Sequence, residues 1–217
     1  MTSHMTQIAH PEYNPGGDEL SQNCGPTSLA MGLNRLGLGP PPLPSRPTGR
    51  TCASGLSLDC RVQDRIDAAR YAMFSDSLGR TLNTEKDGVE WTASGPSKAL
   101  RKHQSLINLD DLRRGAANSG ALAIPLTSLR EVGRALGHNQ PVLLLGNPAA
   151  SGAYGPQLGV HYRGGHVILA VAYEGGFRVH DPLCLTGPAW VSCDEMDAFC
   201  GARIFGDQLG LALCAAS

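Results

Sequence analysis

Three residues combine side-chain types and neighbours that could carry out nucleophilic chemistry. Cys24 opens an apolar, helix-like segment, residues 24–36, and is followed at once by Gly-Pro-Thr. His166 follows two glycines at the start of a strand-like segment, and Asp181 comes directly after the next strand-like segment. A cysteine that attacks a carbonyl carbon needs a histidine to move protons and a third group to orient that histidine. The three residues therefore predict a thiol hydrolase.

The position of Cys24 would make its thiol reactive. A free thiol has a pKa of about 8.5, so little thiolate exists at neutral pH. The first turn of a helix presents unpaired N–H groups and the positive end of the helix dipole, and both favour the thiolate. A nearby imidazolium would lower the pKa further. The alternative is a buried structural cysteine, but the Gly-Pro-Thr sequel and the downstream histidine and aspartate favour the nucleophile.

His166 is the predicted general base, with His161 and His180 as the alternatives. It opens the first strand of a predicted hairpin, so its ring can point from the end of the sheet towards the start of the helix. Asp181 follows the second strand. A turn centred on Gly175 places residue 184 roughly opposite His166, and a β-bulge or a longer turn would bring Asp181 close to it. There it could accept a hydrogen bond from the ring and fix its tautomer. The alternative for Asp181 is a simple turn residue, because Asp-Pro is common in turns.

An oxyanion hole requires hydrogen-bond donors around the carbonyl oxygen under attack. We expect the backbone N–H of Cys24 to be one donor and the side chain of Gln22 to be another, with Asn23 behind it. The alternative is that Gln22 only lines the entrance to the helix.

Composition and charge exclude several function classes. The 217 residues carry a formal net charge of −1 and are 41% hydrophobic, which gives no electrostatic case for binding nucleic acid or an anionic membrane. Cys184, Cys193 and Cys200 lack the paired spacing of zinc ligands, and no phosphate-binding loop is found, so neither a metal nor a cofactor is expected. Seven cysteines without regular spacing indicate reduced thiols in a cytosol.

The apolar periodicity predicts an α+β fold in which a helical lobe packs on an antiparallel β-sheet. Residues 1–20 are expected to form an irregular lead-in, with residues 1–5 resembling a remnant of an expression tag, and residues 21–217 a single domain. No signal peptide is predicted. Predicted helices cover residues 24–36, 60–73, 94–100 and 128–136, with a short helix after Ser192; predicted strands cover residues 141–145, 166–173, 177–180 and 189–191, and residues 209–213 could form either.

The chain resembles the C39-like branch of the papain-like cysteine peptidases, which includes the bacteriocin-processing peptidases. The resemblance extends from residue 22 to residue 200 and rests on residues 22–31, 141–143, 165–168 and 181–182. It implies a papain-like fold with Cys24 as the nucleophile at the start of a central helix, His166 as general base and acid, and Asp181 as the orienting residue. One departure concerns the oxyanion hole, because the family's glutamine stands further upstream than Gln22, where this chain has Asp18.

These features together predict a cysteine peptidase that cleaves a protein or peptide amide through an acyl-enzyme. The resemblance further suggests a bacterial effector or antibacterial toxin, made in the cytoplasm without a signal peptide and delivered into a target cell by a secretion system. An immunity protein that blocks the site would then be a partner. Alternatives are a peptidoglycan amidase, a protein deamidase or an acyltransferase with the same triad, and a catalytically inactive binding module of the same fold.

Overall fold

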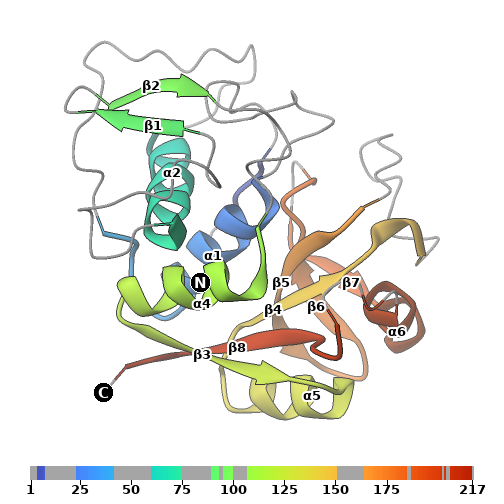
Figure 1. The fold of residues 1–217 in the computed structure, drawn as a ribbon. Coiled ribbons are helices and arrows are strands. Elements are labelled where there is room, and N and C mark those ends of the chain that lie inside the picture. The colour runs from blue at the N-terminus through green and yellow to red at the C-terminus, as the bar shows by residue number, and fades with distance from the viewer. Residues whose placement is uncertain are drawn as a thin grey trace.

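A six-stranded antiparallel sheet forms the centre of the fold, with helices on both of its faces (Figure 1). The computed structural model describes residues 4–7, 23–41, 60–74, 89–92, 95–99, 107–150, 164–184, 187–201, 203 and 206–216. The strands follow one another across the sheet in the order β3 (Ala121–Leu126), β8 (Gly210–Ala215), β4 (Val142–Gly146), β5 (His166–Tyr173), β6 (Phe177–His180) and β7 (Ala189–Val191). All neighbouring strands are antiparallel. The predicted α+β fold is confirmed.

The helices divide between the two faces of the sheet. One face carries α1 (Cys24–Arg35), α2 (Cys60–Phe74) and α4 (Leu109–Asn118), and the other carries α5 (Leu129–Gly137) and α6 (Cys193–Gly201). Within β4, Leu143 and Leu145 pack into the α1 layer, whereas Val142 and Leu144 pack into the α5 layer. Successive side chains of a strand point to opposite faces. Burial on both faces therefore explains why β4 is a continuous apolar run.

Helix α1 lies very close to the sheet. A Cβ atom added to Gly32 would lie 2.6 Å from Leu213 Cδ1 and 3.3 Å from Leu169 Cδ1, so a larger residue would force these leucine side chains to move. Nearer to the start of the helix, Ser28 Oγ donates a hydrogen bond of 2.9 Å to the backbone oxygen of Val167. These two contacts hold the N-terminal end of α1 beside the first residues of β5.

The hairpin of β5 and β6 forms as predicted. Gly175 adopts a φ of 76° in the turn, a conformation that favours glycine. The register pairs Leu169 with His180 and shifts by one residue between Ala170 and Ala172. That irregularity is a β-bulge, and it places His180, the last residue of β6, opposite Leu169 in β5.

The predicted short helix at residues 94–100 is wrong. Gly95–Ala99 is strand β2, which pairs antiparallel with β1 (Val89–Thr92) in a separate two-stranded sheet. The Ser-Gly-Pro sequence is typical of a helix start, but a helix of so few residues is not stable by itself. Pairing with β1 satisfies their backbone instead.

Helix α4 and strand β3, like β1, were not predicted. Helix α4 begins at a capping box in which Asn108 and Asp111 each accept the other's backbone N–H at 2.9 Å. Strand β3 includes Pro125, which is tolerated because β3 lies at the edge of the sheet. The undecided C-terminal segment is strand β8, and a short 3-10 helix, η4 (Pro148–Ala150), follows β4.

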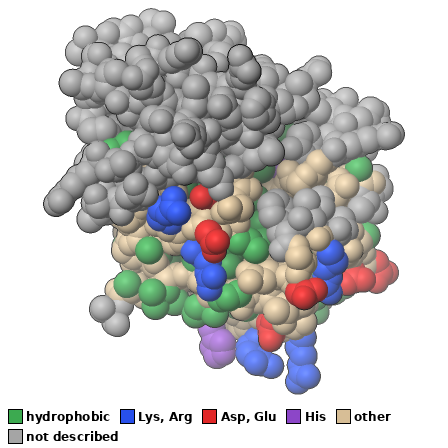
Figure 2. Space-filling view, in the orientation of Figure 1, with side chains coloured by type: hydrophobic (Ala, Val, Ile, Leu, Met, Phe, Trp, Pro, Cys, Tyr) green, Lys and Arg blue, Asp and Glu red, His purple; other side chains and the backbone are tan. Residues whose placement is uncertain are grey.

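The surface shows no concentration of one charge on the described part of the face in Figure 2, where basic and acidic side chains are interspersed. This agrees with the formal net charge of −1. Among the described helices, none combines the length and the apolar character that a membrane crossing requires.

Candidate active site

The candidate site lies where the start of α1 meets the start of β5. Cys24 is the first residue of α1 and is partly exposed, and the first turn contains no acidic residue. Its thiol therefore lies at the positive end of the helix dipole without a competing carboxylate. The hydrogen bond from Ser28 to Val167 fixes α1 against β5 one turn further on. The helix start and the strand start are thus held together by a contact that does not involve the reactive groups.

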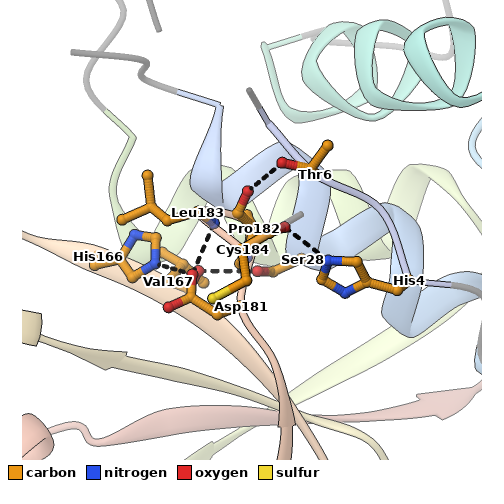
Figure 3. Close-up of polar contacts among 9 residues, drawn as sticks. All are labelled: His4, Thr6, Ser28, His166, Val167, Asp181, Pro182, Leu183 and Cys184. Atoms are coloured by element: carbon orange, nitrogen blue, oxygen red, sulfur yellow. Dashed lines mark hydrogen bonds and ion pairs between the residues drawn. The ribbon is translucent and has the colours of Figure 1, made fainter. Parts of the chain in front are cut away.

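His166 and Asp181 form a buried hydrogen-bonded pair. His166 Nε2 and Asp181 Oδ1 are 2.7 Å apart, and both side chains are almost fully buried (Figure 3). The same oxygen of Asp181 accepts a hydrogen bond of 2.8 Å from the backbone N–H of Leu183, and the backbone N–H of Cys184 donates to the carbonyl of Asp181 at 2.9 Å. These contacts make residues 181–184 a tight turn, called the Asp181 turn below. The carboxylate is held in one orientation by the turn that contains it.

Hydrogen bonding determines how the His166 ring is used. An ionised carboxylate only accepts hydrogen bonds, so Nε2 of His166 carries the hydrogen that is shared with Asp181. The ring also makes a side-chain hydrogen bond with Cys24. Because Nε2 is engaged by Asp181, Nδ1 is the nitrogen left to exchange a proton with the sulfur. The three predicted triad residues are therefore brought together in a single hydrogen-bonded chain.

The electrostatics of this chain favour an ion pair. Burial of the sulfur acts to raise the pKa of Cys24, but the hydrogen bond and the charge of His166, with backbone hydrogen bonds from Val167 and Gly25, lower that pKa overall. Burial acts to lower the pKa of His166, but the charge and hydrogen bond of Asp181 and the contact with Cys24 raise it to about 10. A thiolate facing an imidazolium is the state that both shifts favour.

Two other cysteines, Cys184 and Cys200, have raised pKa values, in contrast to Cys24. Burial, together with the charge of Asp181, raises the pKa of Cys184 to about 12, and burial with the charge of Asp197 raises the pKa of Cys200 to about 12. These thiols are protonated at neutral pH and therefore unreactive. The pKa of Cys24 is lowered instead, because of the hydrogen bond and the charge of His166.

Comparisons with known proteins identify the family of the chain. The sequence model of the Peptidase C39-like family matches residues 2–198. The chain belongs to the C39-like peptidase family. A candidate C39-like peptidase from Bacillus anthracis, known from its crystal structure, has a similar fold, with a TM-score of 0.53 and 15% sequence identity over 100% of this chain and 96% of that one. No curated protein matches the chain. The predicted resemblance to C39-like peptidases is confirmed, and membership of the family supports a cysteine peptidase activity.

The structure gives a different result for each of the remaining predicted site residues. Gln22 and the alternative base His161 lie outside the described residues. Asn23 is fully buried, and its Oδ1 accepts a hydrogen bond of 2.9 Å from Nε of the buried Arg70 in α2. The other alternative base, His180, lies next to Asp181 but contacts His4 at 3.2 Å. His166 is therefore the histidine that the structure brings to Cys24 and Asp181, and Asn23 connects α1 with α2.

Gln7 is a residue that the sequence analysis missed. It is buried, and its backbone N–H donates a hydrogen bond of 2.8 Å to the carbonyl of Pro182, the residue after Asp181. Only Gln7 and Gln22 precede Cys24 in the sequence as glutamines. The family's glutamine stands further upstream than Gln22, at a place where this chain has Asp18. That difference is a reason to consider Gln7, the other glutamine before Cys24. Gln7 lies far from Cys24 along the chain but beside the Asp181 turn in space.

A metal centre was not expected. Within the described part of the chain, no group of three or more histidine, cysteine, aspartate or glutamate side chains is arranged to hold a metal ion.

Proposed function

We propose that this C39-like peptidase cleaves protein or peptide amide bonds by covalent catalysis through Cys24. The observation that carries the proposal is the hydrogen-bonded chain from Cys24 through His166 to Asp181, at the start of a helix and with a pKa lowered at the sulfur and raised at the ring. Such a chain supplies a nucleophile, a proton carrier and an orienting group.

The proposed reaction has two steps. The Cys24 thiolate adds to the carbonyl carbon, and the carbon–nitrogen bond breaks as the His166 imidazolium gives its proton to the leaving amine. A thioester and a neutral imidazole result. His166 then takes a proton from water, which attacks the thioester; the product carboxylic acid leaves and the thiolate–imidazolium pair is restored.

Mapping of new protein termini tests the peptidase function. The wild type and Cys24→Ala are each incubated with a bacterial proteome, and new N-termini are identified by mass spectrometry. We expect termini that appear only with the wild type and that share residues around the cleaved bond. If no such termini appear but muropeptides are released from bacterial sacculi, the enzyme is an amidase and the peptidase proposal is wrong.

Asp181 is proposed to orient His166. With a peptide taken from a mapped cleavage site, we expect Asp181→Ala to lower kcat about 10²- to 10⁴-fold, because the ring loses its acceptor and its neighbouring charge. Asp181→Asn retains an oxygen acceptor and should lose much less, as in related Cys-His-Asn sites. Steady-state kinetics of the two variants provide the comparison. An unchanged kcat in Asp181→Ala would contradict the orienting role.

Gln7 is proposed as the side-chain donor of the oxyanion hole, together with the backbone N–H of Cys24. Its support is its burial and its attachment to the Asp181 turn. We expect Gln7→Ala to lower kcat about 10²- to 10³-fold with little change in KM, since a donor aimed at the oxyanion acts mainly in the transition state. Gln22→Ala is the matched comparison. A larger loss of kcat in Gln22→Ala than in Gln7→Ala would show that Gln22, the residue predicted from the sequence, is the side-chain donor.

A role as an effector or antibacterial toxin is proposed from the family resemblance alone. Expression of the chain in the cytoplasm and, separately, in the periplasm of a bacterial host tests it. We expect growth to be inhibited by the wild type in one of these compartments and not by Cys24→Ala. Normal growth with both proteins, at equal expression levels, would argue against a toxin and leave the peptidase proposal standing.

A further inference from the structure

Residues 4–7 form a short segment, called the N-terminal strap below, that packs against the Asp181 turn. Met5 is buried in the core with the side chains of α1, and its backbone N–H contacts Met31 Sδ at 3.2 Å. Thr6 Oγ1 donates a hydrogen bond of 2.9 Å to the carbonyl of Pro182, and the backbone N–H of Gln7 donates to the same oxygen at 2.8 Å. The strap therefore connects α1 with the turn that carries the triad aspartate.

His4 adds two further contacts, one at each end of the turn. Its Nε2 lies 2.8 Å from the backbone oxygen of Cys184, and its Nδ1 lies 3.2 Å from Nδ1 of His180 (the Cys184 contact is drawn in Figure 3). The two rings are nearly parallel, with an interplanar angle of 21°. Since His180 and Cys184 stand on either side of Asp181, the His4 ring bridges the strand end before the turn and the last residue within it.

The chemistry of the two rings assigns their hydrogens. A carbonyl can only accept, so Nε2 of His4 must carry a hydrogen. In a neutral His4 ring Nδ1 is then bare, and the contact with His180 requires a hydrogen on Nδ1 of His180. If the two rings together gain one proton, a single hydrogen can still lie between the two facing Nδ1 atoms. A second additional proton puts two N–H groups head to head across 3.2 Å, and the contact breaks.

We propose that His4 and His180 are positioning residues of the active site, forming a latch that holds the N-terminal strap on the Asp181 turn and that opens when both rings are protonated. The latch acts on catalysis through Asp181, whose contact with His166 depends on the shape of the turn. This inference rests on the proposed function for its effect on turnover, but the latch itself is a property of the fold.

The charged groups around the latch favour its closed state at neutral pH. Burial, the charge of His4 and the charge of Arg35 in α1 lower the pKa of His180 from 6.5 to about 4. Burial also lowers the pKa of His4, against the opposing influence of the Cys184 carbonyl and the Asp181 charge. A histidine whose pKa is lowered by folding contributes stability above the unfolded-state pKa and loses it as the pH falls towards the folded-state pKa. The latch is therefore closed above about pH 6.5 and opens towards pH 4.

Hydrogen exchange of two backbone amides tests the opening without a substrate. The amides of Gln7 and Cys184 donate the hydrogen bonds that fasten the strap and close the turn. Between neutral pH and about pH 4, we expect their protection factors to fall at least about tenfold in the wild type. His180→Asn, whose amide can replace the Nδ1–H donor but does not titrate, should keep its protection. Equal protection at both pH values in the wild type would overturn the proposal.

Nitrogen NMR and a double-mutant cycle test the latch at neutral pH. We expect His180 as the Nδ1–H tautomer and His4 as the Nε2–H tautomer. His4→Ala and His180→Ala should each raise the apparent pKa of Cys24, measured by the pH dependence of its alkylation, by about one unit, and the double variant by no more than either single one. His180→Asn should restore the wild-type value, and the exposed His138→Ala should not change it.

The outcomes separate this inference from the proposed function. If the alkylation pKa is unchanged in both alanine variants, or if their effects add in the double variant, the latch does not position Asp181, whatever the substrate is. If the wild type cleaves no peptide, the exchange, tautomer and alkylation results still decide the latch. A loss of kcat/KM of about 10- to 100-fold in both alanine variants, restored by His180→Asn, would complete the connection to turnover.

Discussion

Replacing Cys24 by alanine is expected to lower kcat at least about 10⁴-fold, to the level left by binding and by the oxyanion donors alone. The reason is that the Cys24 sulfur forms the proposed covalent intermediate and alanine has no nucleophile, whereas the hydrogen bond from Ser28 to Val167 still holds the helix in place. Steady-state hydrolysis of a mapped peptide, with thermal unfolding as a check of folding, provides the measurement.

The matched control for this prediction is Cys193→Ala. Cys193 is also partly exposed, but it begins α6 on the opposite face of the sheet. We expect this variant to retain wild-type kcat. Substantial hydrolysis by Cys24→Ala, or an equal loss in both variants, would show that the nucleophile lies elsewhere.

Replacing His166 by glutamine is expected to have the second largest effect, a loss of kcat of about 10⁴-fold or more. The glutamine amide can still donate to Asp181, so the turn and the sheet should remain folded, but it cannot carry a proton between sulfur, amine and water. The pKa of Cys24 should rise as well, because burial of the sulfur would then be opposed only by the backbone hydrogen bonds from Val167 and Gly25.

Alkylation of Cys24 as a function of pH measures this second effect separately from turnover. The control is His138→Gln, since His138 is exposed at the end of α5. We expect a wild-type alkylation profile in the control and a shift to higher pH in His166→Gln. A loss of kcat in His166→Gln without any shift in the alkylation profile would mean that His166 acts only as a proton carrier and does not stabilise the thiolate.

Signals that are local in the sequence predicted the parts of the site that depend on local structure. The apolar spacing after Cys24 predicted α1, and the double glycine of residues 175–176 predicted the hairpin of β5 and β6. Because Cys24 begins one element and His166 begins another, knowing the elements was sufficient to predict both residues. Strand pairing alone was not sufficient for Asp181, because the register counted from the turn places residue 184 roughly opposite His166.

Contacts between distant segments could not be predicted in this way. Gln7 and Pro182 lie at opposite ends of the chain, as do His4 and His180, and no periodicity relates them. The first 20 residues were therefore expected to be only an irregular lead-in, although Met5 is part of the core. Prediction from local sequence also fails for residues 95–99. Their conformation is determined by pairing with strand β1 rather than by their own secondary-structure propensity.

The buried pair of His166 and Asp181 explains why the site depends on its surroundings. An imidazolium with almost no exposure to solvent would normally lose its proton, and the adjacent carboxylate prevents this. The carboxylate in turn depends on the backbone N–H of Leu183 and on the Asp181 turn. Reactivity at Cys24 is thus connected through hydrogen bonds to residues 4–7, far from it in sequence.

The central claim is that Cys24 is ionised at neutral pH by His166, and the rate of its alkylation by iodoacetamide against pH tests this most directly. Mass spectrometry of the labelled protein assigns the reaction to Cys24, and glutathione serves as the free-thiol reference. We expect an apparent pKa below the ordinary value of about 8.5 and, at about pH 6, a reaction faster than that of glutathione. An apparent pKa at or above 8.5, with Cys24 no faster than glutathione at about pH 6, would contradict it.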